Sequence, residues 1–321
     1  MPRSANQKKK LLLLVKIFSE YSDSENLLTM NDLITHLSRC GISAERKSIY
    51  QDIEALRELG YDIITVKGKN CGYYLGSRVF ELPEIKLLID AVCASKFITQ
   101  KKSRELVKKL SEFASVSQRK NLKREVFVSD RVKNSNEKIY YAVDIIHEAI
   151  SENRNITFNY YMWNEKKEKV YRHGGKRYNV SPYLLVWDDE NYYLAAYDCD
   201  ASEIRHYRVD KMDCVKISDE KRSGKEAFDG YDVSQYTRSR FGMFSGEPEN
   251  VTLLCENSFA NIIIDKFGKD PVFISEGDRF RVTVKVAVSP VFLGWIFGFG
   301  GKIKIVAPDS AVREFEKLKN Q

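Results

Sequence analysis

The chain has 321 residues, of which 43% are hydrophobic and 30% charged, so it is long enough for roughly two or three domains with apolar cores. Its net charge is +7, which favours a polyanionic partner. Lys8 to Lys10 resemble the basic start of a signal peptide, but the apolar run that follows, Leu11 to Val15, is too short to span a bilayer and lacks a cleavage site. We therefore expect a soluble, cytoplasmic protein.

The first 80 residues predict three helices and a hairpin. Apolar residues at helical spacing from Leu11 to Phe18 predict the first helix. Thr29 or Asn31 caps a second short helix, and Ser43 caps a third that ends at Gly60. The third helix is expected to bury Ile49, Ile53, Leu56 and Leu59. Strands at 61–66 and 71–75 then flank a turn that contains lysines.

This arrangement predicts a winged helix-turn-helix over residues 1–80 that binds double-stranded DNA. Arginine and glutamine near the start of the third helix can read base edges, while lysine, serine and tyrosine suit phosphates. A small helical module that binds another protein is the alternative. The candidate DNA-binding residues are Ser43, Arg46, Lys47, Ser48, Tyr50 and Gln51 on the third helix, with Lys67 and Lys69 at the hairpin tip.

Residues 81–136 predict a helical linker, with helices at 82–97 and 103–113. Within it, residues 101–124 contain nine Lys/Arg and two Glu, a basic block that either contacts DNA or is a solvated helix face. A further helix at 137–153 begins a domain that extends to residue 220. Its short strands, separated by polar turns, predict a small antiparallel barrel.

Residues 221–247 are rich in Gly, Ser and charge and form a connection. Over residues 248–321 the patterns predict strand, helix, two strands, helix, strand and a last helix, the order of a ferredoxin-like domain. The chain is therefore expected to have an α+β multidomain fold.

Neither a catalytic centre nor a cofactor site is expected. The six cysteines are scattered without a C-x-x-C pair, and the four histidines lie in separate elements. Gly298 to Lys302 resemble a phosphate-binding loop, but Ile303 stands where Ser or Thr is required. We therefore expect a protein that is not an enzyme and that holds no metal.

Several motifs occur in an order typical of one family. They are Tyr192-Tyr193-Leu194, the run R-H-Y-R-V-D-K from Arg205 to Lys211, Pro182-Tyr183 upstream, and G-Y-Y-L from Gly72 to Leu75. The chain resembles the WYL-domain transcriptional regulators over nearly its whole length, with Tyr192 in place of the usual Trp. The resemblance implies a promoter-binding N-terminal domain, an SH3- or Sm-like WYL domain at 137–220 that senses an effector, and an extension that assists sensing or dimerisation.

The residues themselves suggest what the effector is. An arginine beside tyrosines suits a nucleotide or a nucleic-acid-like anion, because guanidinium pairs with phosphate and aromatic rings stack on bases. Leu194 marks the core side of its strand, so Tyr192 is expected to be structural and Tyr193 to meet the ligand. Alternatively, Arg208 pairs with Asp210 to fix the barrel. The candidate effector-binding residues are Tyr160, Tyr183, Tyr193, Arg205, His206 and Arg208.

These observations predict a homodimeric transcriptional regulator controlled by an effector. The competing hypothesis is a single-stranded nucleic-acid-binding accessory protein of a defence or repair system, in which the first domain adds only non-specific affinity.

Overall fold

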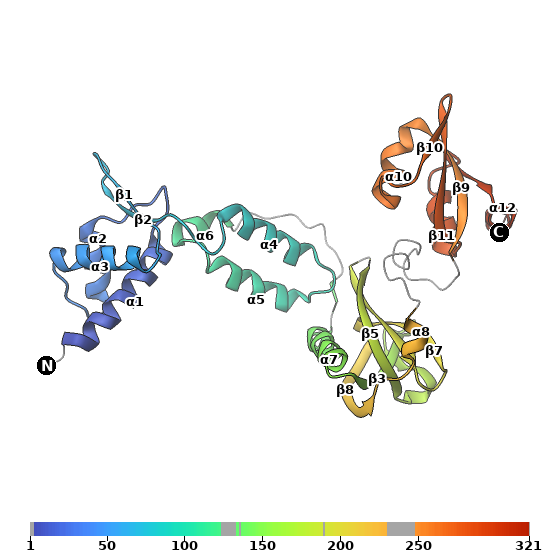
Figure 1. The fold of residues 1–321 in the computed structure, drawn as a ribbon, viewed down its shortest axis with the longest axis horizontal. Helices are drawn as coiled ribbons and strands as arrows, with labels where there is room; N and C mark the ends of the chain where they lie inside the picture. The colour runs from blue at the N-terminus through green and yellow to red at the C-terminus, as the bar shows by residue number, and fades with distance from the viewer. Residues whose placement is uncertain (1–2, 123–132, 135, 189, 230–247, 321) are drawn as a thin grey trace. The chain divides into compact units, whose positions relative to one another are not determined.

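The structure is a computed structural model that describes residues 3–122, 133–134, 136–188, 190–229 and 248–320. It contains two compact units, Met1–Glu137 and Lys138–Gln321, and several separate sheets accompanied by helices (Figure 1). The expectation of an α+β multidomain architecture is therefore confirmed. Among the described residues, no helix is both long and apolar enough to cross a membrane.

The first unit begins with three helices and a hairpin, as the sequence predicted (Figure 1). Thr29 caps the second helix in a capping box with Asp32, which satisfies the amide groups at the helix start. The core between the helices contains Leu14, Phe18, Leu33, Leu37, Ile49, Ile53 and Leu56. The elements are α1 (Arg3–Tyr21), α2 (Met30–Arg39), α3 (Arg46–Glu58), β1 (Ile63–Val66) and β2 (Gly72–Leu75).

Two expectations for α3 were wrong. Its N-cap is Glu45, which has extended backbone and no capping side-chain hydrogen bond, so the helix begins two residues later than a Ser43 cap would place it. Leu59 is 70% exposed, because it lies beyond the last helical residue and no longer follows the repeat that directs Ile53 and Leu56 inward.

The segment predicted as a linker packs against these helices within the first unit. It forms α4 (Leu82–Ala94), α5 (Gln100–Ser111) and α6 (Val116–Leu122), the last of which the sequence did not predict. Arg78 donates hydrogen bonds to the carbonyl oxygens of Ser19 and Ser22, and the Ser115 hydroxyl donates to buried Asp23. In the basic block, Lys102 pairs with Glu105 and Lys101 with Glu137; residues 123 and 124 lie outside the described residues.

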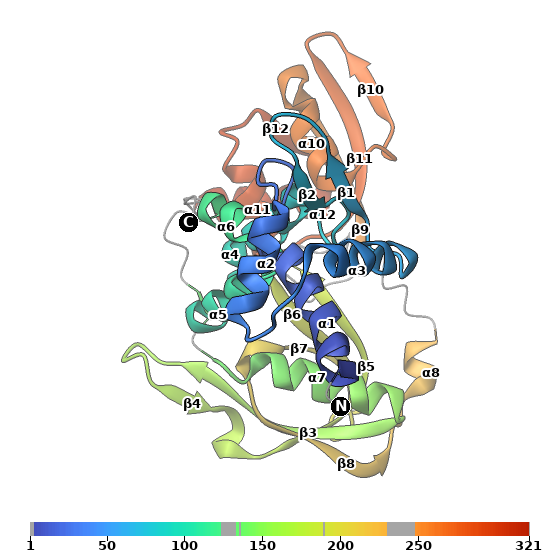
Figure 2. The ribbon, with the colours of Figure 1, turned by 90° about the vertical axis from the view of Figure 1, so that its left-hand side faces the viewer.

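The second unit begins with α7 (Ile139–Ser151), which packs on a curled antiparallel sheet (Figure 2). The strand order is β4-β3-β5-β6-β7, and β8 also pairs with β3. Strand β3 therefore pairs with three strands in turn, and bulges in its pairing with β8 let the sheet curl. The strands are β3 (Arg154–Trp163), β4 (Lys169–Tyr171), β5 (Tyr178–Asp188), β6 (Asn191–Asp198), β7 (Glu203–Arg208) and β8 (Met212–Lys221).

Three short helical segments accompany this sheet: η1 (Arg172–Gly175), η2 (Val209–Lys211) and α8 (Lys225–Phe228). Phe158, Val180, Leu194 and Val209 are fully buried, so alternate residues of several strands meet in one core. Five of the eight residues of β6 are buried, and they belong to both faces of the strand.

The C-terminal residues form a separate four-stranded antiparallel sheet in the order β10-β11-β9-β12, with its own apolar core. The order of strands and helices is the one expected for residues 248–321, with a short η3 added (Figure 1). The elements are β9 (Pro248–Glu256), η3 (Asn257–Phe259), α10 (Ala260–Phe267), β10 (Phe273–Glu276), β11 (Arg279–Ala287), α11 (Pro290–Phe297), β12 (Ile303–Ala307) and α12 (Asp309–Lys319).

Candidate functional site

The outer face of α3 carries polar residues that are exposed, whereas Ile49 and Ile53 on its inner face are buried. Tyr50 is 49% exposed, although such a large aromatic ring is usually covered. The hairpin tip between β1 and β2 is also exposed. The predicted DNA-binding residues that are exposed are Ser43, Arg46, Lys47, Tyr50 and Gln51, together with Lys67 and Lys69 at the tip.

Ser48 has a different position from the rest of this set. Its hydroxyl accepts a hydrogen bond of 2.5 Å from Lys10 of α1, so it helps to hold α3 from within. Lys10 also forms a 2.6 Å ion pair with Asp52, and both side chains are less than one-tenth exposed. Arg46 remains exposed but donates a 2.7 Å hydrogen bond to Asn31 at the start of α2. These contacts fix α3 against both preceding helices.

Arg57 joins α3 to the hairpin, a role that the helical pattern alone did not reveal. Its guanidinium donates to the Ile63 carbonyl oxygen at 2.8 Å and to the Thr65 hydroxyl at 2.6 Å. Because both acceptors belong to β1, the lysine-bearing tip is held in a fixed position relative to the outer face of α3.

In the curled sheet, Arg208 forms the structural pairing that was the alternative to ligand binding. Its guanidinium makes two hydrogen bonds to Asp210, at 3.0 and 3.1 Å, and one of 2.9 Å to Asn191. Burial lowers the pKa of Arg208, but the hydrogen bonds and charge of Asp210, together with Tyr193 and Tyr160, raise it by more in sum, so the pKa lies above its ordinary value. The backbone amide of Arg208 donates to the Tyr160 hydroxyl at 3.1 Å, which joins β7 to β3.

The two adjacent tyrosines differ in exposure, and the role expected of each stays a prediction. Tyr193 lies opposite Arg208 in the strand register but is only 8% exposed. Tyr192 is more exposed, and its ring lies 4.6 Å from that of Trp187. His206 is half-buried and lies opposite Ala195 in the register.

Tyr183 is covered by residues that follow β8. Its hydroxyl donates to the Ser223 carbonyl oxygen at 2.9 Å, its ring stacks on Phe228 at 4.4 Å, and the Arg222 guanidinium lies 4.8 Å from its ring centre. Burial raises the pKa of Tyr183, and Arg222 partly opposes this. This tyrosine therefore holds the start of the connecting segment, a role that the sequence did not indicate.

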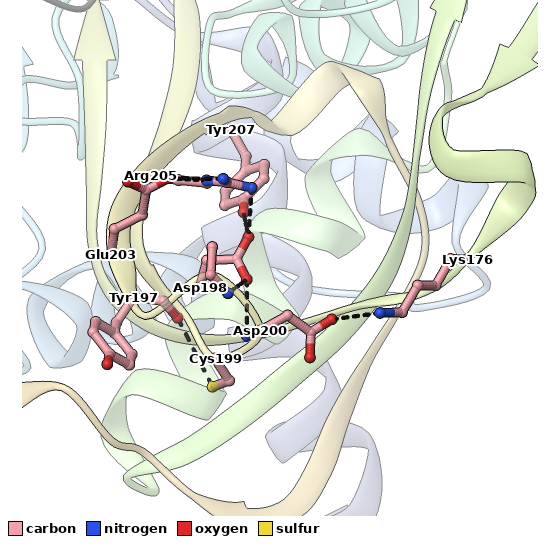
Figure 3. A network of polar contacts seen from close by, with 9 residues as sticks. Lys176, Tyr197, Asp198, Cys199, Asp200, Glu203, Arg205 and Tyr207 are labelled. Atoms are coloured by element: carbon pink, nitrogen blue, oxygen red, sulfur yellow. Dashed lines mark hydrogen bonds and ion pairs between the residues drawn. The ribbon is translucent and has the colours of Figure 1, made fainter.

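Arg205, in contrast, lines a hollow of about 240 Å³ at one end of the sheet. The hollow lies between the loop that leads into β5 and the turn between β6 and β7 (Figure 3). It is rich in charged side chains, and no residue of the loop before β5 was among the candidates from sequence. Its lining residues are His173, Lys176, Arg177, Tyr178, Asp198, Asp200, Ala201 and Arg205.

Buried Asp198 organises the floor of the hollow (Figure 3). It accepts hydrogen bonds from the Tyr207 hydroxyl at 2.7 Å, from Arg205 at 3.1 Å, and from the amides of Asp200 and Ala201, each at 3.1 Å. Burial alone would raise the pKa of Asp198, but these hydrogen bonds and the Arg205 charge hold it below its usual value. Burial and the bond to Asp198 raise the pKa of Tyr207.

The opposite wall is a loop with left-handed backbone at His173, Gly174 and Gly175. The Asn159 side chain donates to the Gly175 carbonyl oxygen at 2.7 Å, which attaches the loop to β3. The sequence signal for this wall is R-H-G-G-K-R, residues 172–177, in which basic residues flank two glycines. Within the described residues, no group of His, Cys, Asp or Glu could hold a metal ion.

Comparisons with known proteins identify two domains. Residues 141–217 match the WYL domain, and residues 247–318 match the WCX domain. No curated protein matches the chain.

Two solved structures resemble the chain at low similarity. Proteasome accessory factor B/C (PafBC) of Arthrobacter aurescens is 17% identical with a TM-score of 0.28, and the match covers 97% of this chain and 47% of that one. A CRISPR Cas-related protein is 15% identical with a TM-score of 0.38, over 98% of this chain and 84% of that one. The chain thus spans about half the length of the Arthrobacter aurescens protein.

Proposed function

We propose that this chain, which carries a WYL domain and a WCX domain, is a DNA-binding transcriptional regulator whose affinity for double-stranded DNA is set by an anionic effector. In this proposal residues 1–80 are a winged helix-turn-helix, the WYL domain is an SH3- or Sm-like barrel that binds the effector, and residues 248–321 are a ferredoxin-like extension. The protein acts as a homodimer and catalyses no reaction.

The observation that carries the proposal is the outer face of α3. Arg46, Lys47 and Gln51 are exposed there together, while the apolar stripe of the same helix is buried. A helix of this kind fits the major groove, where Arg and Gln side chains can pair with base edges. Lys67 and Lys69 at the hairpin tip provide charges suited to adjacent phosphates.

Two internal contacts support this use of α3. The buried Lys10–Asp52 ion pair and the Arg57 hydrogen bonds to β1 hold the helix and the hairpin without using the outer face. Groups that are fixed before binding lose less conformational entropy when the complex forms. The outer face is therefore presented as a pre-organised surface.

The effector part of the proposal depends on the charged end of the WYL domain. Arg205, which the sequence singled out, lines the hollow there together with Lys176 and Arg177. Regulation requires the effector to bind the DNA-competent and the DNA-incompetent arrangements with different affinities. Equal affinity for both would leave the equilibrium between them unchanged.

The test measures binding to duplex DNA from upstream of the protein's own gene by fluorescence anisotropy over a range of salt concentrations. Gln51→Ala is expected to lose about 1–3 kcal/mol of preference for that duplex over a random one. Lys67→Ala is expected to weaken binding to all duplexes and to reduce the salt slope by about one unit. Lys86→Ala, on an exposed lysine of α4, is the matched control and should leave both quantities unchanged. Equal affinity of the unmodified protein for both duplexes would contradict the proposal.

A second candidate function, binding of single-stranded nucleic acid, is favoured by the exposed rings of Trp163 and Tyr171 on the paired strands β3 and β4, which both contact the buried ring of Tyr161. Trp163 is 45% exposed, and the ammonium group of Lys211 lies 6.0 Å from the centre of its ring. The ammonium group of Lys169 lies 4.3 Å from the centre of the Tyr161 ring. Exposed aromatic rings beside cations can stack on bases without sequence preference.

Two substitutions distinguish the candidate functions. If the protein is a regulator, Arg46→Ala abolishes its preference for a specific duplex, whereas Trp163→Ala leaves that preference unchanged. If it is an accessory protein, no duplex preference exists and Trp163→Ala lowers the affinity for a short single strand, by about 1–3 kcal/mol for one stacked base.

A further inference from the structure

Strand β11 of the C-terminal sheet is longer than its neighbour β10, so part of its edge has no partner strand (Figure 2). The two strands pair only from Phe273 with Val282 to Glu276 with Arg279, whereas β9 pairs with β11 over its whole length. Among the described residues, no strand therefore pairs with residues 283–287 on the β10 side. A stretch of this length spans roughly 17 Å, the length of an ordinary strand.

A hollow of about 260 Å³ lies beside this unpaired edge. One wall is the end of α10 with the loop that follows it, including Phe267 and Pro271, and the other is β11 from Thr283 to Lys285. Within the described residues the loop makes no backbone hydrogen bond to this part of β11, so it borders the edge without pairing to it. The volume is below the usual range for a whole ligand, so the hollow suits one or two side chains of a longer molecule.

The alternation of side chains along β11 defines what an added strand would meet. An unpaired strand edge presents amide and carbonyl groups to which an extended chain can hydrogen bond. Val284 belongs to the apolar core and is 3% exposed, whereas Thr283 and Lys285 are exposed on the other face of the sheet. Because directly opposite residues share a face, a strand added here would place one side chain opposite Val284, in the hollow beside Phe267, and the next one opposite Lys285.

Lys285 indicates the charge of the strand that fits. Its partner in the register with β9 is the uncharged Asn250, and it forms no ion pair within the described part of the chain. Opposite charges on facing residues stabilise a strand pair, and like charges destabilise it. Two copies of this edge paired about a two-fold axis through position 285 would set two lysines against each other, which disfavours a second copy of the chain. The charge favours an acidic strand from a different protein.

We propose that the unpaired edge of β11 binds an extended acidic peptide of another protein, which adds a strand along residues 283–287. A carboxylate of the peptide lies opposite Lys285, and an apolar side chain fills the hollow beside Phe267. This inference goes beyond the function proposed above, because it concerns a protein partner and requires neither DNA nor an effector. Its test is therefore independent of the tests of that function.

The test begins with selection of random heptapeptides displayed on phage against the full chain. The enriched peptides should carry Asp or Glu next to an apolar residue, and the most enriched one is synthesised as the probe. Lys285→Glu should weaken binding of this peptide by about tenfold in fluorescence anisotropy, because a favourable cross-strand pair becomes a repulsive one. Lys304→Glu, on an exposed lysine of the edge strand β12, is the matched control and should leave the affinity unchanged.

Two N-methylated forms of the same peptide test strand addition itself. Alternate amides of an extended strand point to opposite sides, so methylation of one alternating set should abolish binding and methylation of the other should leave it nearly unchanged. Hydrogen exchange measured residue by residue should show that alternate amides of residues 283–287 exchange rapidly in the free chain and become protected when the peptide is bound.

Four results would overturn the proposal. The first is no enrichment of acidic peptides in the selection, and the second is equal weakening of binding by Lys285→Glu and Lys304→Glu. The third is equal affinity for the two methylated peptides, which would exclude pairing through the main chain. The fourth is protection of all amides of residues 283–287 in the free chain, or peptide-induced protection only in β10 or β12, since the edge would then be occupied or the site elsewhere.

Discussion

The buried ion pair between Lys10 and Asp52 provides the sharpest test of how α3 is held. The Nζ–Oδ2 distance is 2.6 Å, and the two side chains are 8% and 7% exposed. Asp52→Ala leaves the Lys10 ammonium buried without its counter-ion, a change that typically costs about 3–5 kcal/mol. Because the Ser48 hydroxyl still accepts a hydrogen bond from Lys10, we expect a loss near the lower limit, about 3 kcal/mol.

The position of the tryptophans makes this loss measurable in the full chain. All three tryptophans, Trp163, Trp187 and Trp295, belong to the second unit, so tryptophan fluorescence does not report on the first. Hydrogen exchange of peptides from α1 and α3, read by mass spectrometry, reports on the first unit directly. A loss of about 3 kcal/mol should speed their slowest exchange by about a hundredfold, while tryptophan fluorescence during urea unfolding stays unchanged.

An exposed pair on the same helix serves as the control. Lys16 and Glu20 lie 3.8 Å apart with side chains that are 66% and 31% exposed, so Glu20→Ala should cost less than about 0.5 kcal/mol. The double variant Lys10→Met with Asp52→Leu should recover most of the stability, because it leaves no buried charge. Equal exchange rates for Asp52→Ala and Glu20→Ala would refute the reasoning, as would a double variant as unstable as Asp52→Ala.

Three further predictions concern the second unit. The pKa of Asp198 is lower in the folded protein than the value of about 3.9 in the unfolded chain. Ionised Asp198 therefore stabilises the folded state above about pH 3.9, and this stabilisation is lost as the pH falls through the folded-state pKa. Asp198→Asn should therefore reduce the acid sensitivity of unfolding followed by tryptophan fluorescence, and an unchanged pH profile would contradict this. Gly224 has φ +76°, and a Cβ there would overlap the ring of Tyr197, so Gly224→Ala should cost about 2–3 kcal/mol in urea unfolding. Gly277→Ala, at φ +68° in open space, should cost about 1 kcal/mol. Burial raises the pKa of Cys255 to about 11, so at about pH 8 iodoacetamide should modify the exposed Cys40 and leave Cys255 unmodified. Equal rates of modification of the two cysteines, measured by mass spectrometry, would contradict the burial of Cys255.

The local elements of the first unit could be predicted because their causes lie within a few residues. The Thr29 cap needs only Asp32, and the buried stripe of α3 follows from the helical repeat. The role of Lys10 could not be predicted in this way. In the sequence it ends a run of three lysines that resembles the basic start of a signal peptide, and only the packing of α1 against α3 places it beside Asp52.

The candidate site in the WYL domain shows the same limit. The strands could be found from alternation, and Arg205 was a candidate because of its motif. The hollow that it lines is formed by segments about 25 residues apart that the sheet register brings together. The covering of Tyr183 depends on Phe228, a residue in a segment that the sequence predicts only as a connection. A strand pattern specifies which face a side chain is on, but not which distant residue covers that face.

In the function that we propose, the chain recognises a specific duplex through the outer face of α3. The most direct measurement is selection of bound sequences from a random duplex library, carried out with the unmodified chain and with Gln51→Ala. For the unmodified chain we expect one enriched motif with two half-sites about 10 base pairs apart, and for the variant relaxed specificity at one position of each half-site. No enrichment over the starting library, or the same motif from both proteins, would contradict it.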